Sequence, residues 1–132
     1  LTILNDAYNA SPSSVRASVE LFRDMSGFSQ KFVVLGDMLE LGERADEYHR
    51  EIGRLLSPES FDYVFTYGPL AKRIAETASP AFAPGRVRWF ERKEDIAEAI
   101  GALATPADGV LVKGSRGMRL EDVVWELAAL TI

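Results

Sequence analysis

Cysteine is absent from the 132-residue chain, which excludes disulfides, thiolate metal sites and cysteine nucleophiles. Histidine occurs once, at His49, so no pair of histidines exists to bind a metal. No apolar run approaches the ~20 residues of a membrane-spanning helix, and no signal peptide is recognisable. Acidic residues outnumber basic ones, 20 to 15, and no basic stripe occurs. These absences argue against a membrane span and a nucleic-acid partner, and they make the cytoplasm the default location.

What is present is the composition of a globular domain, with 47% hydrophobic and 27% charged residues. The length predicts a single domain, residues 1–132, that buries about two thirds of the surface of its unfolded chain. The first residue is Leu1 rather than Met, and it lies in a run typical of a strand. We therefore expect the chain to be a fragment of a longer protein.

Short apolar runs alternate with stretches of helical periodicity along the whole chain. The runs are apolar on both faces, as strands of a covered parallel sheet should be. In the first helical stretch, Val15, Val19 and Phe22 recur at the spacing of one helix face. The alternation predicts an α/β fold, a three-layer αβα Rossmann-like domain with a mostly parallel sheet of five to six strands. The expected strands are Thr2–Leu4, Lys31–Leu35, Tyr63–Tyr67, Val87–Phe90 and Gly109–Val112.

The loops that follow the expected strands are the natural place for a ligand, because open α/β sheets bind ligands beyond the carboxyl ends of their strands. Parallel strands bring these loops to one edge of the sheet. Three of the loops are polar and rich in Gly, Asp or Lys, so their convergence predicts a binding site there. The loops are Asn5–Asn9, Gly36–Gly42, Thr66–Pro69 and Lys113–Gly117.

The first loop carries more polar side chains than a connection needs. Ser11 and Pro12 suit a helix start, with Ser as N-cap and Pro in the first turn. They leave Asp6, Tyr8 and Asn9 unexplained. Carboxylate and amide groups bind hydroxyls and ring nitrogens, and a tyrosine ring stacks on a base, so this set suits a nucleoside better than a phosphate. The alternative is a hydrogen-bonded loop that only fixes the chain.

The last loop, Lys113–Gly117, has the composition of an anion site. Its glycines allow a backbone to approach a ligand, and a helix is expected to begin near Leu120. The anion is a phosphate or a carboxylate. The chain contains neither G-x-x-x-x-G-K-[ST] nor G-x-G-x-x-G after a strand, so this is not one of the standard phosphate loops. The alternative is a glycine-rich turn with solvated basic side chains.

The second loop contains two acids, Asp37 and Glu40, between glycines. They suit a metal or an ammonium group, but such acids more often cap a helix or face solvent. His49 follows on or beside the apolar face of the next helical stretch, and we interpret it as packed or solvent-facing rather than catalytic. Ser115 has no histidine near it in sequence. The residues therefore predict binding loops without a complete catalytic machine.

Three stretches, DAYNASPSS, VVLGDMLELGE and VLVKGSRGMRLEDVV, together resemble the C-terminal domain of the Mur ligase family. Among its members, they are most similar to those that join D-alanyl-D-alanine to UDP-N-acetylmuramoyl tripeptide. The likeness runs in order along nearly the whole chain, although residues 61–104 contribute only their βα pattern. Ser11 stands where the family often has Asn, and both residues cap helices.

The resemblance implies a three-domain, ATP-dependent amide ligase of bacterial cell-wall synthesis, located in the cytoplasm. It implies that the missing central domain carries the phosphate-binding loop and most ligands of Mg²⁺. The C-terminal domain would close over ATP and the incoming dipeptide. ATP would convert the tripeptide carboxylate into an acyl phosphate, which the dipeptide amine then attacks. We expect the isolated domain to fold without catalysing this reaction.

The resemblance also implies roles for ten residues in the three polar loops. The first loop would bind the nucleotide, and the last would face the acyl phosphate and the dipeptide. The acids of the second loop would position the dipeptide amine, and no residue is expected to bind a metal. The assignments are Asn5, Asp6, Tyr8 and Asn9 for the nucleotide, Lys113, Ser115 and Arg116 for catalysis, and Asp37, Glu40 and Gly114 for the substrate.

Two other functions fit the same residues. A sister ligase, such as another Mur ligase or a folylpolyglutamate synthase, would share the fold and the use of ATP but take a different acceptor. A non-catalytic α/β nucleotide-binding module would lack a phosphate-binding loop upstream of this chain. Assays with different acceptors distinguish a sister ligase from the D-alanyl-D-alanine ligase. The sequence that precedes this chain distinguishes a ligase from a non-catalytic module.

Overall fold

The computed structural model describes residues 1–130 and contains one sheet of five parallel strands. The strands are β1 (Thr2–Asp6), β2 (Lys31–Gly36), β3 (Tyr63–Tyr67), β4 (Val87–Phe90) and β5 (Gly109–Lys113). The helices are α1 (Pro12–Asp24), α2 (Ala45–Leu55), α3 (Lys72–Ala78), α4 (Glu94–Leu103) and α5 (Glu121–Ala128). Short 3-10 turns are η1 (Gly42–Arg44), η2 (Ser79–Ala81) and η3 (Arg116–Met118).

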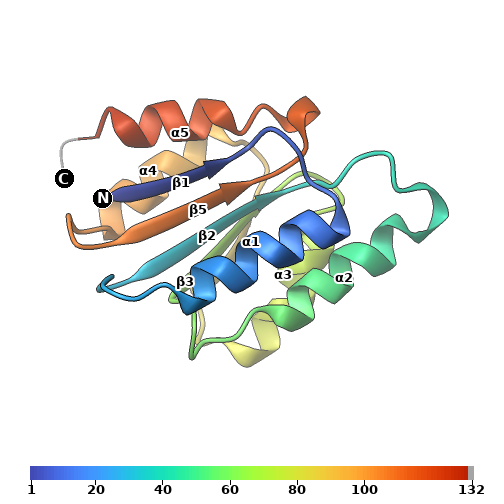
Figure 1. Cartoon of the computed structure of the whole chain (residues 1–132), viewed down its shortest axis with the longest axis horizontal. Helices are drawn as coiled ribbons and strands as arrows, with labels where there is room; N and C mark the ends of the chain where they lie inside the picture. The colour runs from blue at the N-terminus through green and yellow to red at the C-terminus, as the bar shows by residue number, and fades with distance from the viewer. Residues whose placement is uncertain (131–132) are drawn as a thin grey trace.

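The sheet has the order β1-β5-β2-β3-β4 and lies between two layers of helices (Figure 1). Helices α1, α2 and α3 cover one face, and α4 and α5 cover the other. The three-layer fold with a parallel sheet is therefore confirmed, with five strands within the described residues.

Three strands extend further than their apolar runs predicted. β3 and β4 have the expected bounds, but β1 continues through Asn5 to Asp6, β2 to Gly36 and β5 to Lys113. In the ladder, Asn5 pairs with Val112 and Asp6 pairs with Lys113. Backbone pairing does not require an apolar side chain, so hydropathy placed these strand ends too early. The correction puts Asp6 and Lys113 side by side on neighbouring strands.

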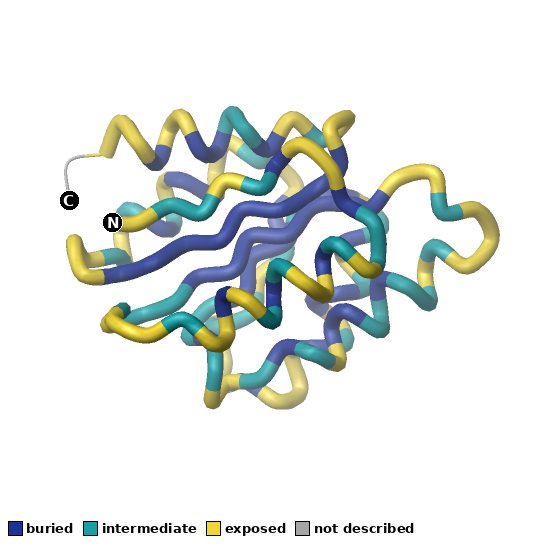
Figure 2. Tube along the Cα trace, viewed as in Figure 1, coloured by how far each residue is buried: buried dark blue, intermediate teal, exposed yellow. Residues whose placement is uncertain are grey.

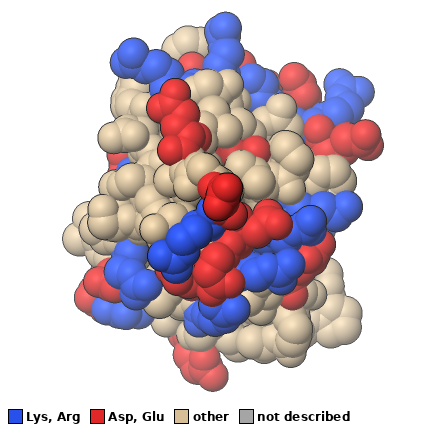
Figure 3. Space-filling view, turned by 90° about the vertical axis from the view of Figure 1, so that its right-hand side faces the viewer, with Lys and Arg blue, Asp and Glu red and all other residues tan. Residues whose placement is uncertain are grey.

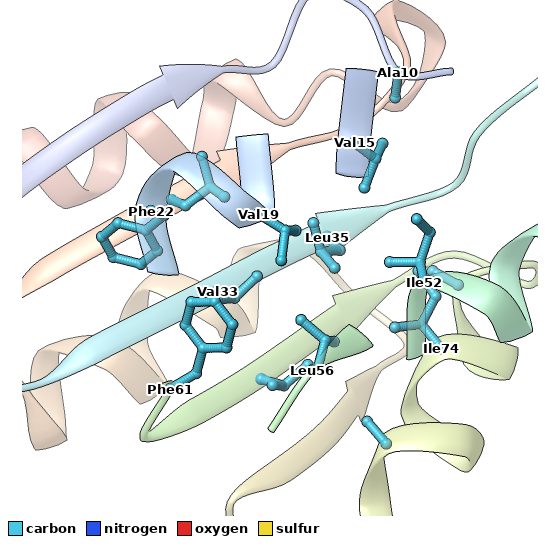
Figure 4. Close-up of a cluster of buried hydrophobic side chains, with 14 of the residues drawn as sticks. Ala10, Val15, Val19, Phe22, Val33, Leu35, Ile52, Leu56, Phe61 and Ile74 are labelled. Atoms are coloured by element: carbon cyan, nitrogen blue, oxygen red, sulfur yellow. The ribbon is translucent and has the colours of Figure 1, made fainter. Parts of the chain in front are cut away.

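Helix α1 begins as its sequence predicts. The Ser11 hydroxyl accepts from the backbone N–H of Ser14, and the Ser14 hydroxyl accepts from the N–H of Ser11, with Pro12 in the first turn. This reciprocal cap satisfies two backbone donors that would otherwise have no partner. The predicted apolar face, Val15 and Phe22 among it, is buried against the sheet (Figure 4).

Two apolar cores fill the spaces on either side of the sheet. Side chains of β2 alternate between them, with Val33 and Leu35 in the core under α1–α3 and Phe32 and Val34 in the core under α4 and α5. Strand β5 is buried along its whole length, and the two central strands form the most deeply buried part of the fold (Figure 2). Both faces of these strands are covered, which explains their continuous apolar sequence.

Strand β5 is the point at which the chain changes faces. Its neighbours β1 and β2 both lead into helices of one layer, whereas β5 leads into α5 in the opposite layer. Loops that leave neighbouring strands in opposite directions open a crevice at the carboxyl ends of those strands. The expected ligand site is therefore at the carboxyl ends of β1, β5 and β2.

Candidate functional site

A cleft of about 340 Å³ opens at this edge of the sheet, and we call it the rim cleft. It is formed by the loops after β1, β2 and β5, which are three of the four loops that the sequence predicted to converge. Its lining residues are Tyr8, Asn9, Ala10, Leu39, Glu40, Ser115, Arg116 and Gly117.

The loop after β3 does not line the rim cleft. Its Gly68 has φ 110° and lies against the carboxylate of Asp37, where a Cβ atom would collide. A larger hollow of about 450 Å³ lies between β4 and α4, but it contains none of the predicted site residues. Within residues 1–130, the rim cleft is the hollow that the loops after β1, β2 and β5 line together.

Charge on this edge is mixed rather than of one sign. Figure 3 looks onto the side of the molecule toward which the strands point, and acidic and basic side chains are interspersed across it. Such a surface does not present the continuous basic stripe that a nucleic-acid backbone requires. It suits a small ligand that carries both charged and neutral groups.

In the loop after β1, the predicted residues have different roles. Asn5 Oδ1 accepts from the Ala7 backbone N–H at 3.2 Å, so this side chain holds the turn. Tyr8 is 60% exposed and presents its ring at the rim cleft, beside Asn9. The structure thus brings Tyr8 and Asn9 to the rim cleft, whereas Asn5 and Asp6 line a separate hollow of about 270 Å³ beside it.

Asp6 and Lys113 form an ion pair beneath the same loop. Lys113 Nζ donates to Asp6 Oδ2 and to the Asn9 carbonyl oxygen, both at 2.8 Å, and its side chain is 3% exposed. Ser18 Oγ donates to Asp6 Oδ2 at 2.6 Å. Burial by itself raises the pKa of Asp6, but the bonds from Lys113 and Ser18, with the charge of Lys113, outweigh it and hold the pKa below the ordinary value.

Ser115 connects all three loops of the rim cleft. Its hydroxyl accepts from the Leu39 backbone N–H at 2.9 Å and lies 3.4 Å from the Ala10 carbonyl oxygen. Its own backbone N–H donates to the Asp37 carbonyl oxygen at 3.1 Å. Arg116, the next residue, is exposed and lines the cleft. Ser115 therefore organises the site, and Arg116 is the basic group that remains accessible.

Gly114 is needed for packing. A Cβ atom on Gly114 would lie 2.7 Å from Leu120 Cδ1, and one on Gly36 would lie 2.8 Å from the same atom. The two glycines let Leu120 pack tightly where β2 and β5 end. The space beside Gly114 is thus filled by a side chain of the protein, whereas the sequence suggested close approach of a ligand.

The two acids of the loop after β2 lie at different depths. Asp37 is buried, and its Oδ1 accepts from the Ala71 backbone N–H at 2.7 Å, ahead of α3. Burial raises its pKa, although the N–H groups of Ala71 and Leu70 oppose the shift. Glu40 is exposed at the rim cleft with φ 62°. That left-handed conformation costs a non-glycine residue about 1 kcal/mol.

His49 is fully buried, as one of the two alternatives from the sequence predicted. Its Nε2 accepts from the Met38 backbone N–H at 2.9 Å. Nothing in the sequence connects His49 with the site, because the contact depends on how α2 packs beside the end of β2. The only signal was a histidine on the same helix face as Ile52.

The described residues contain no helix long and apolar enough to cross a bilayer. Within residues 1–130, no group of three His, Asp or Glu side chains is arranged to hold a metal ion. The donor set of the rim cleft is one exposed carboxylate with amide, hydroxyl, phenol and guanidinium groups. Such a set binds an organic ligand and does not fit a resident metal.

Comparison with known proteins identifies relatives over most of the chain. Residues 1–116 match the family described as Mur ligase, glutamate ligase domain. The UDP-N-acetylmuramoyl-tripeptide–D-alanyl-D-alanine ligase of Bacillus subtilis is 46% identical over 127 residues, which are 96% of this chain and 28% of the relative. The ligase of the same name from Escherichia coli is 32% identical, over 92% of this chain and 26% of its own length.

Solved structures show the same arrangement. MurF from Thermotoga maritima, in complex with ADP, superposes with a TM-score of 0.76 and 31% identity, over 95% of this chain and 27% of its own. MurF from Acinetobacter baumannii superposes with a TM-score of 0.81 and 27% identity, over the same shares. The chain thus spans about a quarter of the length of these relatives. On the family match and these identities, the chain belongs to the Mur ligase family.

Proposed function

We propose that this chain is the C-terminal domain of an ATP-dependent ligase that joins D-alanyl-D-alanine to UDP-N-acetylmuramoyl tripeptide in peptidoglycan synthesis. The observation that carries the proposal is the convergence of three polar loops on one cleft, in a chain 46% identical to a relative named for this reaction. The ligase would comprise three domains, of which residues 1–132 form the last, and would work in the bacterial cytoplasm.

The nucleotide is assigned to the β1 side of the rim cleft. The Thermotoga maritima relative was solved with ADP, and we propose ATP as the nucleotide of this chain. The exposed ring of Tyr8 is available to stack on a base, and the Asn9 amide is available to hydrogen-bond it. Asp6 uses Oδ2 for its two bonds within the chain, and its half-exposed carboxylate offers Oδ1 to a ribose hydroxyl. Asn5 supports this loop through its turn.

The acyl phosphate and the dipeptide are assigned to the β5 side. Arg116 is the exposed cation of the rim cleft, so it would bind the dipeptide carboxylate or the phosphoryl oxygens. Lys113 and Ser115 would act indirectly, by holding the loops that position the substrate, because their polar atoms already bond to those loops. Gly114 would serve the substrate by letting Leu120 pack beneath this loop.

The dipeptide amine is assigned to the β2 side. Glu40 is exposed at the rim cleft and carries the charge that attracts an ammonium group. Asp37 lies below it, where its carboxylate holds the backbone ahead of α3. We therefore propose Glu40 as the group nearer the amine, with Asp37 fixing the wall behind it. Mg²⁺ and the UDP-sugar would be bound mainly by the rest of the ligase, including its central domain.

The decisive experiment is phosphate release from ATP by the full-length protein, with UDP-N-acetylmuramoyl tripeptide present and D-alanyl-D-alanine either added or omitted. Release that requires both substrates supports the proposed reaction. Release that requires glutamate or another amino acid in place of the dipeptide would assign the chain to a sister ligase. A full-length protein that binds ATP but turns over no acceptor would be the non-catalytic module.

A further inference from the structure

His49 lies outside the rim cleft but holds the loop that forms one of its walls. The ring is fully buried, and Nε2 lies 2.9 Å from the Met38 backbone nitrogen. Because that nitrogen carries a proton, Nε2 must be the acceptor. Nδ1 lies 2.6 Å from the Ala45 carbonyl oxygen and therefore carries the ring proton. Two backbone bonds thus fix His49 as one neutral tautomer.

The next residue of the loop is anchored from a different element. The Leu39 N–H donates to Ser115 Oγ at 2.9 Å, directly after the Met38 N–H has been taken by His49. Two consecutive amides are therefore held by side chains from α2 and from the loop after β5. Leu39 and Glu40, which line the rim cleft, follow immediately from these anchors.

Glu40 is the residue whose position depends most on the anchors. Its φ of 62° is unfavourable for a side chain with a Cβ, and such a conformation persists only where neighbouring structure fixes it. Glu40 is exposed, so packing of its own side chain does not supply that constraint. The bonds to Met38 and Leu39, two residues and one residue before Glu40, do supply it.

We propose that His49 is a positioning residue for the acceptor side of the rim cleft. Its Nε2 sets the loop through the Met38 amide and so directs Glu40 toward the incoming amine. The residue touches no substrate and exchanges no proton with one. This inference rests on the proposed ligase function for its kinetic consequence, whereas the anchoring of the loop is a property of the chain itself.

Two substitutions in the full-length protein separate the bonds of His49. His49→Gln places an oxygen near the position of Nε2 and keeps the acceptor for Met38. His49→Asn places its amide near Nδ1, so it keeps the bond to Ala45 and loses the acceptor for Met38. We expect kcat/KM for D-alanyl-D-alanine to fall roughly 10- to 100-fold in the Asn variant and about threefold or less in the Gln variant, with KM for ATP nearly unchanged.

Ile52→Val is the matched control, because it weakens the core on the same face of α2 but leaves both backbone bonds of His49 in place. It should keep all Michaelis constants. Asn and Gln variants that lose the same kcat with unchanged Michaelis constants would overturn the inference, because that pattern indicates a smaller folded fraction. Hydrogen exchange tests the anchor without substrates: the Met38 amide should exchange at least about tenfold faster in the Asn variant than in the Gln variant. Faster exchange of the Met38 amide in a full-length protein whose activity does not depend on the dipeptide would support the anchoring role of His49 and contradict only the proposed ligase function.

Discussion

At the scale of single residues, the Asp6–Lys113 pair makes stability depend on acid pH. The pKa of Asp6 is held below its ordinary value, since the bonds from Lys113 and Ser18 outweigh its burial. The contribution of the pair is therefore complete above the unfolded pKa, about 3.9, and disappears as the pH falls through the lower folded value. We expect Asp6→Asn to destabilise the domain most near neutral pH, and the difference from wild type to shrink below about pH 4.

Urea unfolding of both proteins between neutral pH and about pH 2 measures this difference. Asp24→Asn is the matched control, because Asp24 pairs with the exposed Arg23 and solvent screens that pair. The control should change the free energy of unfolding little at any pH. A penalty for Asp6→Asn that stays constant with pH would show that the hydrogen-bond geometry of Asp6, and not its charge, stabilises the fold.

Tyr8 is the residue for which function and stability separate most clearly. Its side chain is 60% exposed, so Tyr8→Ala should leave the urea midpoint of the domain unchanged. Loss of a stacked aromatic ring costs about 1–3 kcal/mol per base. We therefore expect ATP affinity of the full-length protein, measured by calorimetry, to fall about 5- to 100-fold. Tyr8→Phe retains the ring and should bind as wild type does. An unchanged affinity for ATP in Tyr8→Ala would contradict the proposal that the base stacks on the loop after β1.

At the scale of elements, the end of β5 is joined to α5 through the packing of Leu120 on two glycines. Gly114→Ala puts a methyl group 2.7 Å from Leu120 Cδ1, so the side chain or the helix must shift. Overpacking of this kind costs about 1–3 kcal/mol. We expect urea unfolding to show that loss, and Leu120→Ala in the same chain to relieve part of it. Additive losses in the double variant would contradict direct contact as the cause.

The elements themselves could be predicted, because each leaves a local signal. The buried face of α1 and the apolar runs of β3 and β4 can each be recognised within one short stretch of sequence. The pairing of Asp6 with Lys113 at the polar strand ends could not be predicted, because only the register of β1 on β5 makes these residues neighbours. For the same reason, the sequence predicted which loops converge but not the burial of Asp37 or the bond from the loop after β2 to His49.

At the scale of the whole molecule, both cores are completed by residues of this chain. The apolar faces of α1–α3 and of α4–α5 are buried against the sheet within the described residues. A chain of this length with two closed cores has the means to fold independently. The rim cleft, by contrast, supplies only one wall of the proposed active site, since the phosphate-binding loop and the ligands of Mg²⁺ are assigned to the rest of the ligase.

We therefore expect residues 1–132, expressed alone, to unfold cooperatively in urea but to release no phosphate from ATP with both substrates present. Tryptophan fluorescence and far-ultraviolet circular dichroism should report the same midpoint if the domain unfolds as one unit. Trp89 lies in β4 at one edge of the sheet, and Trp125 lies in α5, which packs on β1 at the other edge, so the fluorescence reports on both ends of the sheet. Two separate midpoints would show that the sheet and the outer helices are not one cooperative unit. Measurable turnover by the isolated domain would place the complete catalytic machinery within this chain and would contradict the proposed assignment of ATP and Mg²⁺ binding to the central domain.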